Sequence, residues 1–376
     1  MKILYAAFRH DPRDIDAASG SDFNYYSAFI RAGAQVELVG PFISPGAWVE
    51  RKFRRLYRAI TGKRYAKFLL SNVLQASREL NRREQILKPD VIFSIFPCSF
   101  VFYNGAAPCV YRLDTSFLGW QEAYPEFGQI ALRMLVWQER RAFERCSRVV
   151  TMSHWSKGVL VRRYGLPEAR VEVMANPCAL PREVVPSNRE FRPKRLETPL
   201  RLLLVGRDYQ RKGIAIAISA VRQLNQTGLQ TELTVCGIEG ASEGPVRFAG
   251  SFRKRVPAEL KQYAELYSRA HLLIHPAVFD PSPIVPAEAA AFGVPTVSND
   301  VGGIATSVAH DVTGIVLPGH SAAEAYVEAI TKLIRNPDKY RLLAVGARKR
   351  YEEEQNWDVA GRRVMQIVEQ AASRRN

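Results

Sequence analysis

Short apolar runs alternate with longer segments of helical period along the whole chain. In the first half the runs are MKILYAAF, QVELVGPF, DVIFSIFP, APCVYRLD, RVVTMS and VEVMANP; in the second half they are LRLLLVGR, TELTVCG, VRFAG, HLLIHPA, VPTVSND and TGIVLP. Strands that alternate with helices are typical of parallel sheets whose two faces are covered by helices. The pattern therefore predicts an α/β fold with two Rossmann-like, doubly wound parallel sheets.

A change of composition in the middle of the chain separates these two blocks. The 376 residues exceed what one hydrophobic core normally supports. Residues 181–199, PREVVPSNREFRPKRLETP, contain four prolines and many charges but little periodicity. We predict an N-terminal domain at 1–180, a linker at 181–199, a C-terminal domain at 200–355, and a final helix at 356–376 that returns to the N-terminal domain.

Charge and cysteine content narrow the class of protein. Lysine and arginine outnumber aspartate and glutamate by 53 to 37, a net charge of +16, which favours an anionic partner. The five cysteines form no CxxC pair, so we expect reduced thiols in a cytoplasm and neither a zinc site nor a disulfide framework. The N-terminal apolar run is too short for a signal peptide, and no run is long enough to span a bilayer. We expect a protein that is soluble or, at most, bound to a membrane surface.

Two carboxylates stand eight residues apart in FDPSPIVPAEAAAFGVP, residues 279–295. Pro286 suits the first turn of a helix, which places Glu288 at the positive end of the helix dipole. Asp280 follows the strand HLLIHPA and so lies at the carboxyl end of a strand, where α/β sheets bind ligands. Amides near the helix start are available for an anion or a sugar oxygen, namely those of Ile284 and Val285. The alternative is structural: Glu288 complements its helix and Asp280 caps a turn.

Neighbouring loops carry further candidate ligands. The strand LLLV ends at Gly206, Arg207 follows at once, and Lys212 precedes a helix, an arrangement suited to a diphosphate. A solvated loop in a basic protein is the alternative. Glycines between a strand and a helix allow close approach of a ligand, although a plain turn needs them equally. Two such loops contain Gly302 with Gly303, and Gly20 with Ser21.

Together these segments resemble the retaining, nucleotide-sugar-dependent glycosyltransferases of family 4, which have the GT-B fold. The matching segments are VGRDYQRKG, the acid-x7-acid spacing of Asp280 and Glu288, AFGVPTVSNDVGG, TGIVLP, NWDVAGRRVMQIVEQ and the turn VMANPC with Asn176. The likeness is specific over the C-terminal half, whereas over the first half it is mainly architectural.

The resemblance implies a role for each matching residue. Arg207 and Lys212 would neutralise the donor diphosphate and stabilise the departing nucleotide, and Glu288 would accept hydrogen bonds from the ribose. Asp280 would hold hydroxyls of the donor sugar, aided by the Ile284 and Val285 amides. The implied donor site also includes Gly20, Ser21, Asn176, Ser251, Phe252, Gly302 and Gly303. UDP is the expected nucleotide, and neither a metal nor another cofactor is required.

The chain departs from the family pattern at several places. Pro281 and Pro283 replace two glycines beside the first acid, and Leu113 stands where many members carry a histidine. Asp114, in YRLDTS, is a candidate for the reaction centre or a helix cap. His154 is interpreted as a structural residue rather than a substitute base.

A basic stretch at residues 51–67, RKFRRLYRAITGKRYAK, has no acidic residue and contains interleaved aromatic and aliphatic side chains. This composition favours a helix on an anionic membrane surface. A solvated cationic face over core residues is the alternative, and phosphate-mediated binding of nucleic acid is a third interpretation without a recognition module to support it. The candidate membrane residues are Arg51, Lys52, Arg54, Arg55, Arg58, Lys63, Arg64 and Lys67.

The sequence thus favours a retaining glycosyltransferase that moves a sugar from a nucleotide-sugar to a glycan or lipid-linked acceptor at the cytoplasmic membrane face. Two alternatives remain open at this stage. One is a nucleotide-sugar epimerase or phosphorylase on the same scaffold. The other is a non-catalytic basic protein that binds a membrane surface or nucleic acid.

Overall fold

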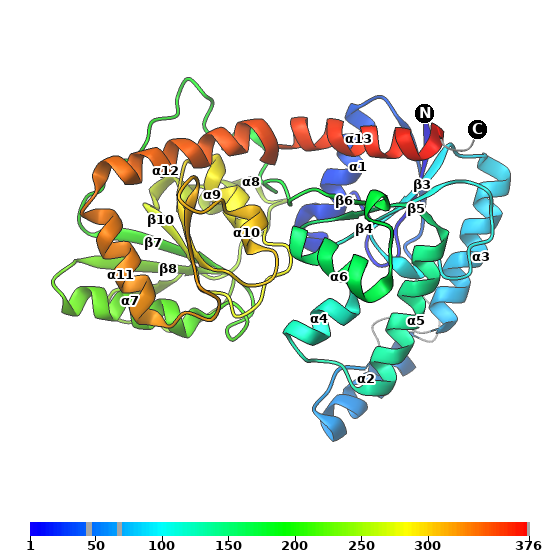
Figure 1. Cartoon of the computed structure of the whole chain (residues 1–376), viewed down its shortest axis with the longest axis horizontal. Helices are drawn as coiled ribbons and strands as arrows, with labels where there is room; N and C mark the ends of the chain where they lie inside the picture. Colours follow the sequence, from blue (N-terminus) through cyan, green and yellow to red (C-terminus); the bar gives the residue numbers. More distant parts are fainter. Residues whose placement is uncertain (43–46, 66–69, 374–376) are drawn as a thin grey trace. The chain divides into compact units, whose positions relative to one another are not determined.

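The computed structural model describes residues 1–42, 47–65 and 70–373, which form two compact units (Figure 1). The first unit comprises Met1–Met174 and the chain end from Gly361, and the second comprises Ala175–Ala360. The segment expected to be a linker, 181–199, belongs to the second unit. Leu180 and Val185 are buried in a core of that unit because they pack against its helices. The tail grouped with the first unit begins at Gly361 rather than at 356.

A six-stranded parallel sheet forms the centre of the first unit, in the order β2-β1-β3-β4-β5-β6. Every apolar run of the first half forms one of its strands. These strands are β1 (Lys2–Ala6), β2 (Gln35–Val39), β3 (Val91–Ser94), β4 (Cys109–Leu113), β5 (Cys146–Thr151) and β6 (Val171–Val173).

Helices cover both faces of this first sheet. On one face Leu4 and Ile92 join a core with Leu80, Phe143 and Leu160 from three helices. On the opposite face Tyr5 and Phe93 pack against aromatic rings of α1. The helices are α1 (Ser21–Arg31), α2 (Ala47–Thr61), α3 (Leu70–Leu87), α4 (Phe117–Ala123), α5 (Gln129–Arg145) and α6 (His154–Tyr164).

The second unit contains another six-stranded parallel sheet, in the order β12-β11-β10-β7-β8-β9. β8 and β9 follow β7 on one side of the sheet. The chain then returns and adds β10, β11 and β12 on the other side of β7. The switch point of the sheet therefore lies between β7 and β10, where open α/β sheets bind ligands. The strands are β7 (Leu200–Val205), β8 (Thr231–Cys236), β9 (Val246–Phe248), β10 (Leu272–His275), β11 (Thr296–Asn299) and β12 (Gly314–Leu317).

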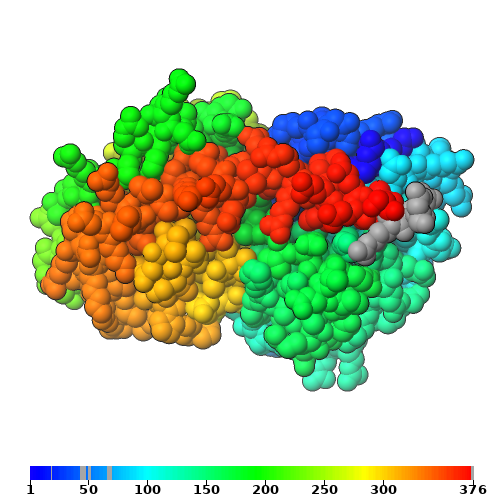
Figure 2. Space-filling view, turned by 45° about the horizontal axis from the view of Figure 1, so that its top comes forward, coloured from blue at the N-terminus to red at the C-terminus, as the bar shows by residue number. Residues whose placement is uncertain are grey.

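Alternation along β7 divides the core of the second unit between the two faces of its sheet. Leu202 and Leu204 pack with α7, α11 and the start of α12, whereas Leu203 and Val205 pack with α8 and α9. Side chains of period two are expected to divide in this way. The helices are α7 (Ile214–Gln226), α8 (Pro257–Arg269), α9 (Val285–Ala291), α10 (Ile304–Ser307), α11 (Ala323–Ile334) and α12 (Pro337–Arg350). The orange α11 and α12 lie at the surface of this unit (Figure 2).

The last part of the chain contains two helices separated by an irregular turn. A π-helical turn at Tyr351–Gln355 follows α12, and α13 spans Trp357–Ser373. The expectation of two doubly wound α/β domains is thereby confirmed. In the part of the chain that the structure describes, no helix combines the length and apolarity needed to cross a membrane.

Candidate active site

The candidate site lies at the carboxyl edge of the second sheet, on its switch point. β7 ends at Val205 and leads through Gly206 and Arg207 to Lys212, and β10 ends at His275 and leads to Asp280. The two strands are parallel neighbours. Their carboxyl ends therefore bring together groups that stand 68 residues apart in the chain.

Two glycines allow the turn after β7 to fold tightly. A Cβ at Gly206 would lie 2.6 Å from Cγ of Lys212, so the missing side chain leaves room for the lysine. Gly213 caps α7 with φ of 64°, and a Cβ there would lie 1.9 Å from the carbonyl oxygen of Pro276. Only glycine fits this left-handed position against the backbone that follows β10.

Asp280 is buried among cationic groups. Its Oδ2 pairs with Nζ of Lys212 and lies 3.2 Å from Nε2 of His275, and its Oδ1 lies 3.9 Å from Nη1 of Arg211. Burial acts to raise the pKa of Asp280, but Lys212, His275 and Arg211 outweigh it and bring that pKa well below its ordinary value. Asp280 is therefore an ionised acceptor held in one orientation and not a proton donor.

The other nitrogen groups of the site differ in charge and in their partners. Burial, followed by the charge of Lys212, lowers the pKa of His275, so this imidazole favours its neutral form. Arg211 donates to the carbonyl oxygen of Phe279 at 3.0 Å and thereby fixes the loop that leads to Asp280. Arg207 is exposed and forms no hydrogen bond or ion pair with the other described residues. Its guanidinium is available to an anionic ligand.

Glu288 is buried in the first turn of α9 and accepts three hydrogen bonds. Nζ of Lys254 donates to Oε1 at 2.9 Å, and the hydroxyls of Tyr263 and Tyr267 donate to Oε2 at 2.7 and 2.6 Å. Burial acts to raise the pKa of Glu288, but Lys254 and the tyrosine hydroxyls outweigh it and lower that pKa. The alternative in which Glu288 only complements its helix does not account for these contacts.

Asn176, Gly302 and Gly303, which are also predicted donor residues, adjoin the loop around Asp280. The amide of Asn176 donates to the carbonyl oxygen of Ser282 at 2.8 Å. Gly303 donates to the carbonyl oxygen of Asp280 at 2.8 Å, and a Cβ at Gly302 would lie 2.6 Å from that same oxygen. The close approach that these glycines permit is therefore to the Asp280 backbone.

Four other predicted donor residues lie at the start of α9 or in the loop after β9. Ile284 caps α9, and Val285 is its first residue; both are half-buried. The Ser251 hydroxyl donates to the carbonyl oxygen of Gly237 at 3.1 Å, at the carboxyl end of β8. The Phe252 ring lies 6.1 Å from that of Tyr263. Contacts of these groups with a nucleotide-sugar stay predictions.

The predicted residues of the first unit lie at the carboxyl ends of its strands. Gly20 caps α1 with φ of 84°, and Ser21 is the first residue of that helix. Asp114 follows β4 and pairs with Nη2 of Arg112 at 2.9 Å. Ser116, not Asp114, caps the following helix by accepting from the amide of Gly119. His154 is exposed at the start of α6.

Sequence reasoning missed several residues that touch the predicted carboxylates. Tyr263 and Tyr267 are four positions apart on α8, a spacing that places them on one helical face, but nothing local connects them to Glu288. Sequence reasoning did not select Arg211, which precedes Lys212, or His275, which stands five residues before Asp280. Lys254 stands in a basic run, where charge alone does not distinguish a buried lysine from a solvated one.

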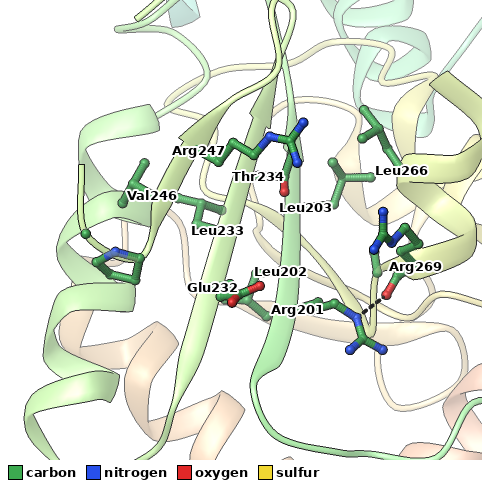
Figure 3. Close-up of a pocket in the computed structure, with 13 residues that line it drawn as sticks. Arg201, Leu202, Leu203, Glu232, Leu233, Thr234, Val246, Arg247, Leu266 and Arg269 are labelled. Atoms are coloured by element: carbon green, nitrogen blue, oxygen red, sulfur yellow. Dashed lines mark hydrogen bonds between the residues drawn. The ribbon is translucent and has the colours of Figure 1, made fainter. Parts of the chain in front are cut away.

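A separate groove of about 370 Å³ lies at the opposite end of the strands (Figure 3). Arg201 and Glu232, at the starts of β7 and β8, line it together with Arg247 and Arg269. Arg201 already donates to the carbonyl oxygen of Arg269 at 2.8 Å and to Glu197 at 2.7 Å. This groove is distinct from the site around Asp280 and Glu288.

The basic stretch forms most of α2 and the turn that follows it. Apolar side chains spaced by three or four residues are exposed on one stripe of this helix: Val49 at 51%, Phe53 at 48%, Leu56 at 59% and Ile60 at 74%. Five of the predicted basic residues are exposed beside them, namely Lys52, Arg55, Arg58, Lys63 and Arg64, while Arg54 is half-buried. Arg51 lies in α2, but its side chain, like the whole of Lys67, falls outside the described residues.

Cysteine and metal chemistry add no further site among the described residues. All five cysteines are buried and unbridged. No group of three or more histidine, cysteine, aspartate or glutamate side chains in the described ranges is placed to hold a metal ion.

Two family models match successive parts of the chain. The Glycosyltransferase Family 4 model matches residues 23–180, and the Glycosyl transferases group 1 model matches residues 187–350. The amylovoran biosynthesis glycosyltransferase AmsK of Erwinia amylovora is 29% identical over 192 residues, 47% of this chain and 46% of AmsK. The alpha-maltose-1-phosphate synthase of Mycolicibacterium smegmatis is 27% identical over 261 residues, 63% of this chain and 66% of the synthase. The matches thus span about half to two thirds of these relatives.

Solved structures resemble the chain over nearly its full length. Sucrose-phosphate synthase of Thermosynechococcus elongatus has a TM-score of 0.70 at 18% identity, with 98% of each chain covered. HepE of Anabaena, solved in complex with UDP-glucose, has a TM-score of 0.65 at 18% identity and covers 98% of this chain and 100% of its own. At these identities the likeness establishes the fold, which is GT-B. With both family models matched in order along this fold, the chain belongs to the family 4 type of glycosyltransferases.

Proposed function

We propose that this protein transfers a sugar from a nucleotide-diphosphate donor, a UDP-sugar, to a glycan or lipid-linked acceptor, with retention of the anomeric configuration. The observation that carries the proposal is the juxtaposition of cations and carboxylates at the switch point of the second sheet. Lys212 pairs with Asp280, Arg211 lies beside them, and Arg207 is exposed at the end of β7. HepE, solved with UDP-glucose and with UDP, supports a UDP-sugar donor.

The charges of this cluster suit a leaving diphosphate. Lys212 pairs with Asp280, and Arg211 lies 3.7 Å from the carboxylate of Asp208, which leaves the exposed guanidinium of Arg207 as net positive charge. Breaking the glycosyl–phosphate bond places negative charge on the departing diphosphate, and fixed cations stabilise it as it forms. Removal of one such group typically costs about 3–4 kcal/mol of transition-state stabilisation. In other transferases a divalent metal stabilises the charge of the diphosphate. In the proposed reaction these cations do so, and no metal is required.

In the proposed reaction the acceptor attacks on the face that the diphosphate leaves. The bond from the anomeric carbon to the β-phosphate oxygen breaks, the bond to the acceptor oxygen forms, and the acceptor proton passes to the diphosphate. Asp280 is ionised and buried, which suits an acceptor for sugar hydroxyls rather than a base. Asp114, held by Arg112 at 2.9 Å, is proposed to act on the acceptor side.

A thermal-shift panel with UDP, GDP and ADP tests the donor class. A ligand at one hundred times its Kd stabilises the folded protein by about 2.7 kcal/mol. For a unit of this size that corresponds to roughly 5–11 °C in Tm. UDP should give the largest shift, and hydrolysis of a panel of nucleotide-sugars should then identify the sugar. If none of the three nucleotides raises Tm, the proposed function is wrong.

The acceptor is proposed to be reached at the cytoplasmic face of a membrane, because α2 combines an exposed apolar stripe with basic residues. Phe53, Leu56 and Ile60 would enter the interface while Arg55 and Arg58 meet anionic headgroups.

The protein should float with anionic vesicles and not with neutral ones. The triple variant Phe53→Ser/Leu56→Ser/Ile60→Ser should stay unbound. Ile130→Ser removes an equally exposed isoleucine from α5 and serves as the matched control. Equal flotation of the triple variant and the control would refute membrane docking through α2.

A further inference from the structure

The hydrogen bonds around Glu288 leave little room for a ribose to bind its carboxylate directly. An ionised carboxylate offers about four lone-pair positions. Lys254, Tyr263 and Tyr267 use three of them, and the Glu288 side chain is only 2% exposed. A ribose presents two adjacent hydroxyls. Both could bind Glu288 only if one of the existing donors left.

The tyrosines are poorly suited to leave. Tyr263 and Tyr267 are buried in α8, and their rings meet edge to face with centroids 5.4 Å apart. The Tyr267 ring also stacks on Phe292 at 5.8 Å. The two hydroxyls lie 3.0 Å apart, so withdrawing either from Glu288 would exchange a charge-assisted hydrogen bond for a weaker neutral one.

Lys254 differs from the tyrosines in position and in bonding capacity. It belongs to the loop between β9 and α8, its side chain is 14% exposed, and its Nζ lies 5.5 Å from the centre of the Tyr263 ring. An ammonium group carries three N–H donors. The hydrogen bond to Glu288 uses one, so two remain for a ligand.

The setting of Lys254 places it with the candidate donor site. Ser251, three residues before Lys254, donates to the carbonyl oxygen of Gly237 just after β8, and Gly206, beside Arg207, donates to that of Cys236, the last residue of β8. The ammonium is therefore near the carboxyl edge that carries the proposed diphosphate cations. Unlike Arg207, however, Lys254 is matched by a buried carboxylate. The pair as a whole is neutral and complements a neutral polyol better than an anion.

We propose that Lys254 is a nucleotide-binding residue, and that it donates its two remaining N–H groups to the 2′ and 3′ hydroxyl oxygens of the donor ribose. Glu288, fixed by Tyr263 and Tyr267, anchors the ammonium and accepts from a hydroxyl through its remaining lone pair. This inference rests on the proposed function and assigns to Lys254 the ribose contact that the sequence assigned to Glu288 alone.

Binding of UDP and 2′-deoxy-UDP to the full chain, measured by calorimetry, tests the proposal. The wild type should bind UDP about tenfold more tightly than 2′-deoxy-UDP. In Lys254→Met the affinity for UDP should fall more than tenfold and that for 2′-deoxy-UDP by a smaller factor, so that the two ligands bind almost equally. Lys261→Met, which removes an exposed lysine from the same helix that carries the tyrosines, should keep the wild-type ratio.

The outcomes separate the ribose role from other roles of Lys254. If Lys254→Met weakens UDP and 2′-deoxy-UDP by the same factor, the lysine acts on the diphosphate or on structure, and the proposal is overturned. Failure of the wild type to bind UDP at all would instead end the proposed function, and this inference with it. Should Lys254→Met not fold, the double variant Lys254→Met/Glu288→Gln, which leaves no buried charge, is compared with Glu288→Gln, so that the effect of the lysine is still isolated.

Discussion

The ion pair of Lys212 and Asp280 should be strongly coupled, and a double-mutant cycle can measure that coupling. Their side chains are only 10% and 7% exposed. Breaking a buried pair by removing one partner typically costs about 3–5 kcal/mol, because the other charge stays buried and uncompensated. For a unit of this size, the expected fall in Tm is roughly 6–20 °C for a single substitution.

The structure also predicts which of the two single variants has the lower Tm. Asp280→Asn leaves the buried Lys212 without its carboxylate partner and beside Arg211, whereas Lys212→Met leaves Asp280 with Arg211 and His275 as partners. Asp280→Asn should therefore have the lower Tm. The double variant should be more stable than the sum of the single effects predicts, since it leaves neither charge alone.

Calorimetric unfolding of the full chain at neutral pH gives the four Tm values of the cycle. The exposed pair Arg222–Glu243 of the same unit, with side chains 54% and 80% exposed, provides the control cycle. Its coupling should stay within about 1 kcal/mol. If the effects of Lys212→Met and Asp280→Asn simply add, the two side chains are not coupled, and the account of the site as a neutral pair flanked by arginines is refuted.

Three further predictions concern single residues. Arg207→Ala should lower turnover on the order of a hundred- to a thousandfold at unchanged Tm, because this exposed side chain has no partner among the described residues; unchanged turnover would remove its assigned role. Gly213→Ala should lower Tm by several degrees, because its Cβ would lie 1.9 Å from the Pro276 carbonyl oxygen at a left-handed φ, and a Tm equal to that of the wild type would contradict this packing. Burial, with the charge of Arg201, lowers the pKa of Lys194 to about 7, so between pH 7 and 9 the unfolded chain holds a proton that the folded protein has lost. The free energy of unfolding of the wild type should therefore rise relative to Lys194→Met by up to about 1.4 kcal/mol per pH unit in that range; parallel pH profiles in urea denaturation would exclude the shift.

The hydrophobic pattern was sufficient for the fold of each unit because it is local. Leu202 and Leu204 face one side of the sheet and Leu203 and Val205 the other, so β7 reads as an apolar run buried on both faces. The pattern also located the ends of the strands, and therefore the loops that carry Arg207, Lys212 and Asp280. Parallel strands end at a common edge, which is why these residues could be grouped before the structure was known. Prolines and charges mark 181–199 as an irregular segment, but they do not reveal that Leu180 and Val185 are buried.

By itself, therefore, the sequence determined two α/β units and the edge of the second sheet at which charged groups gather. Only the tertiary structure decided which partner each charge has. Lys254 reaches Glu288 across 34 residues, and Lys212 reaches Asp280 across 68. Such pairings depend on the strand order, which makes β7 the neighbour of both β8 and β10, and on helix packing that aims Tyr263 and Tyr267 at one carboxylate. No local periodicity encodes these distances, because they arise when separate elements pack on one sheet.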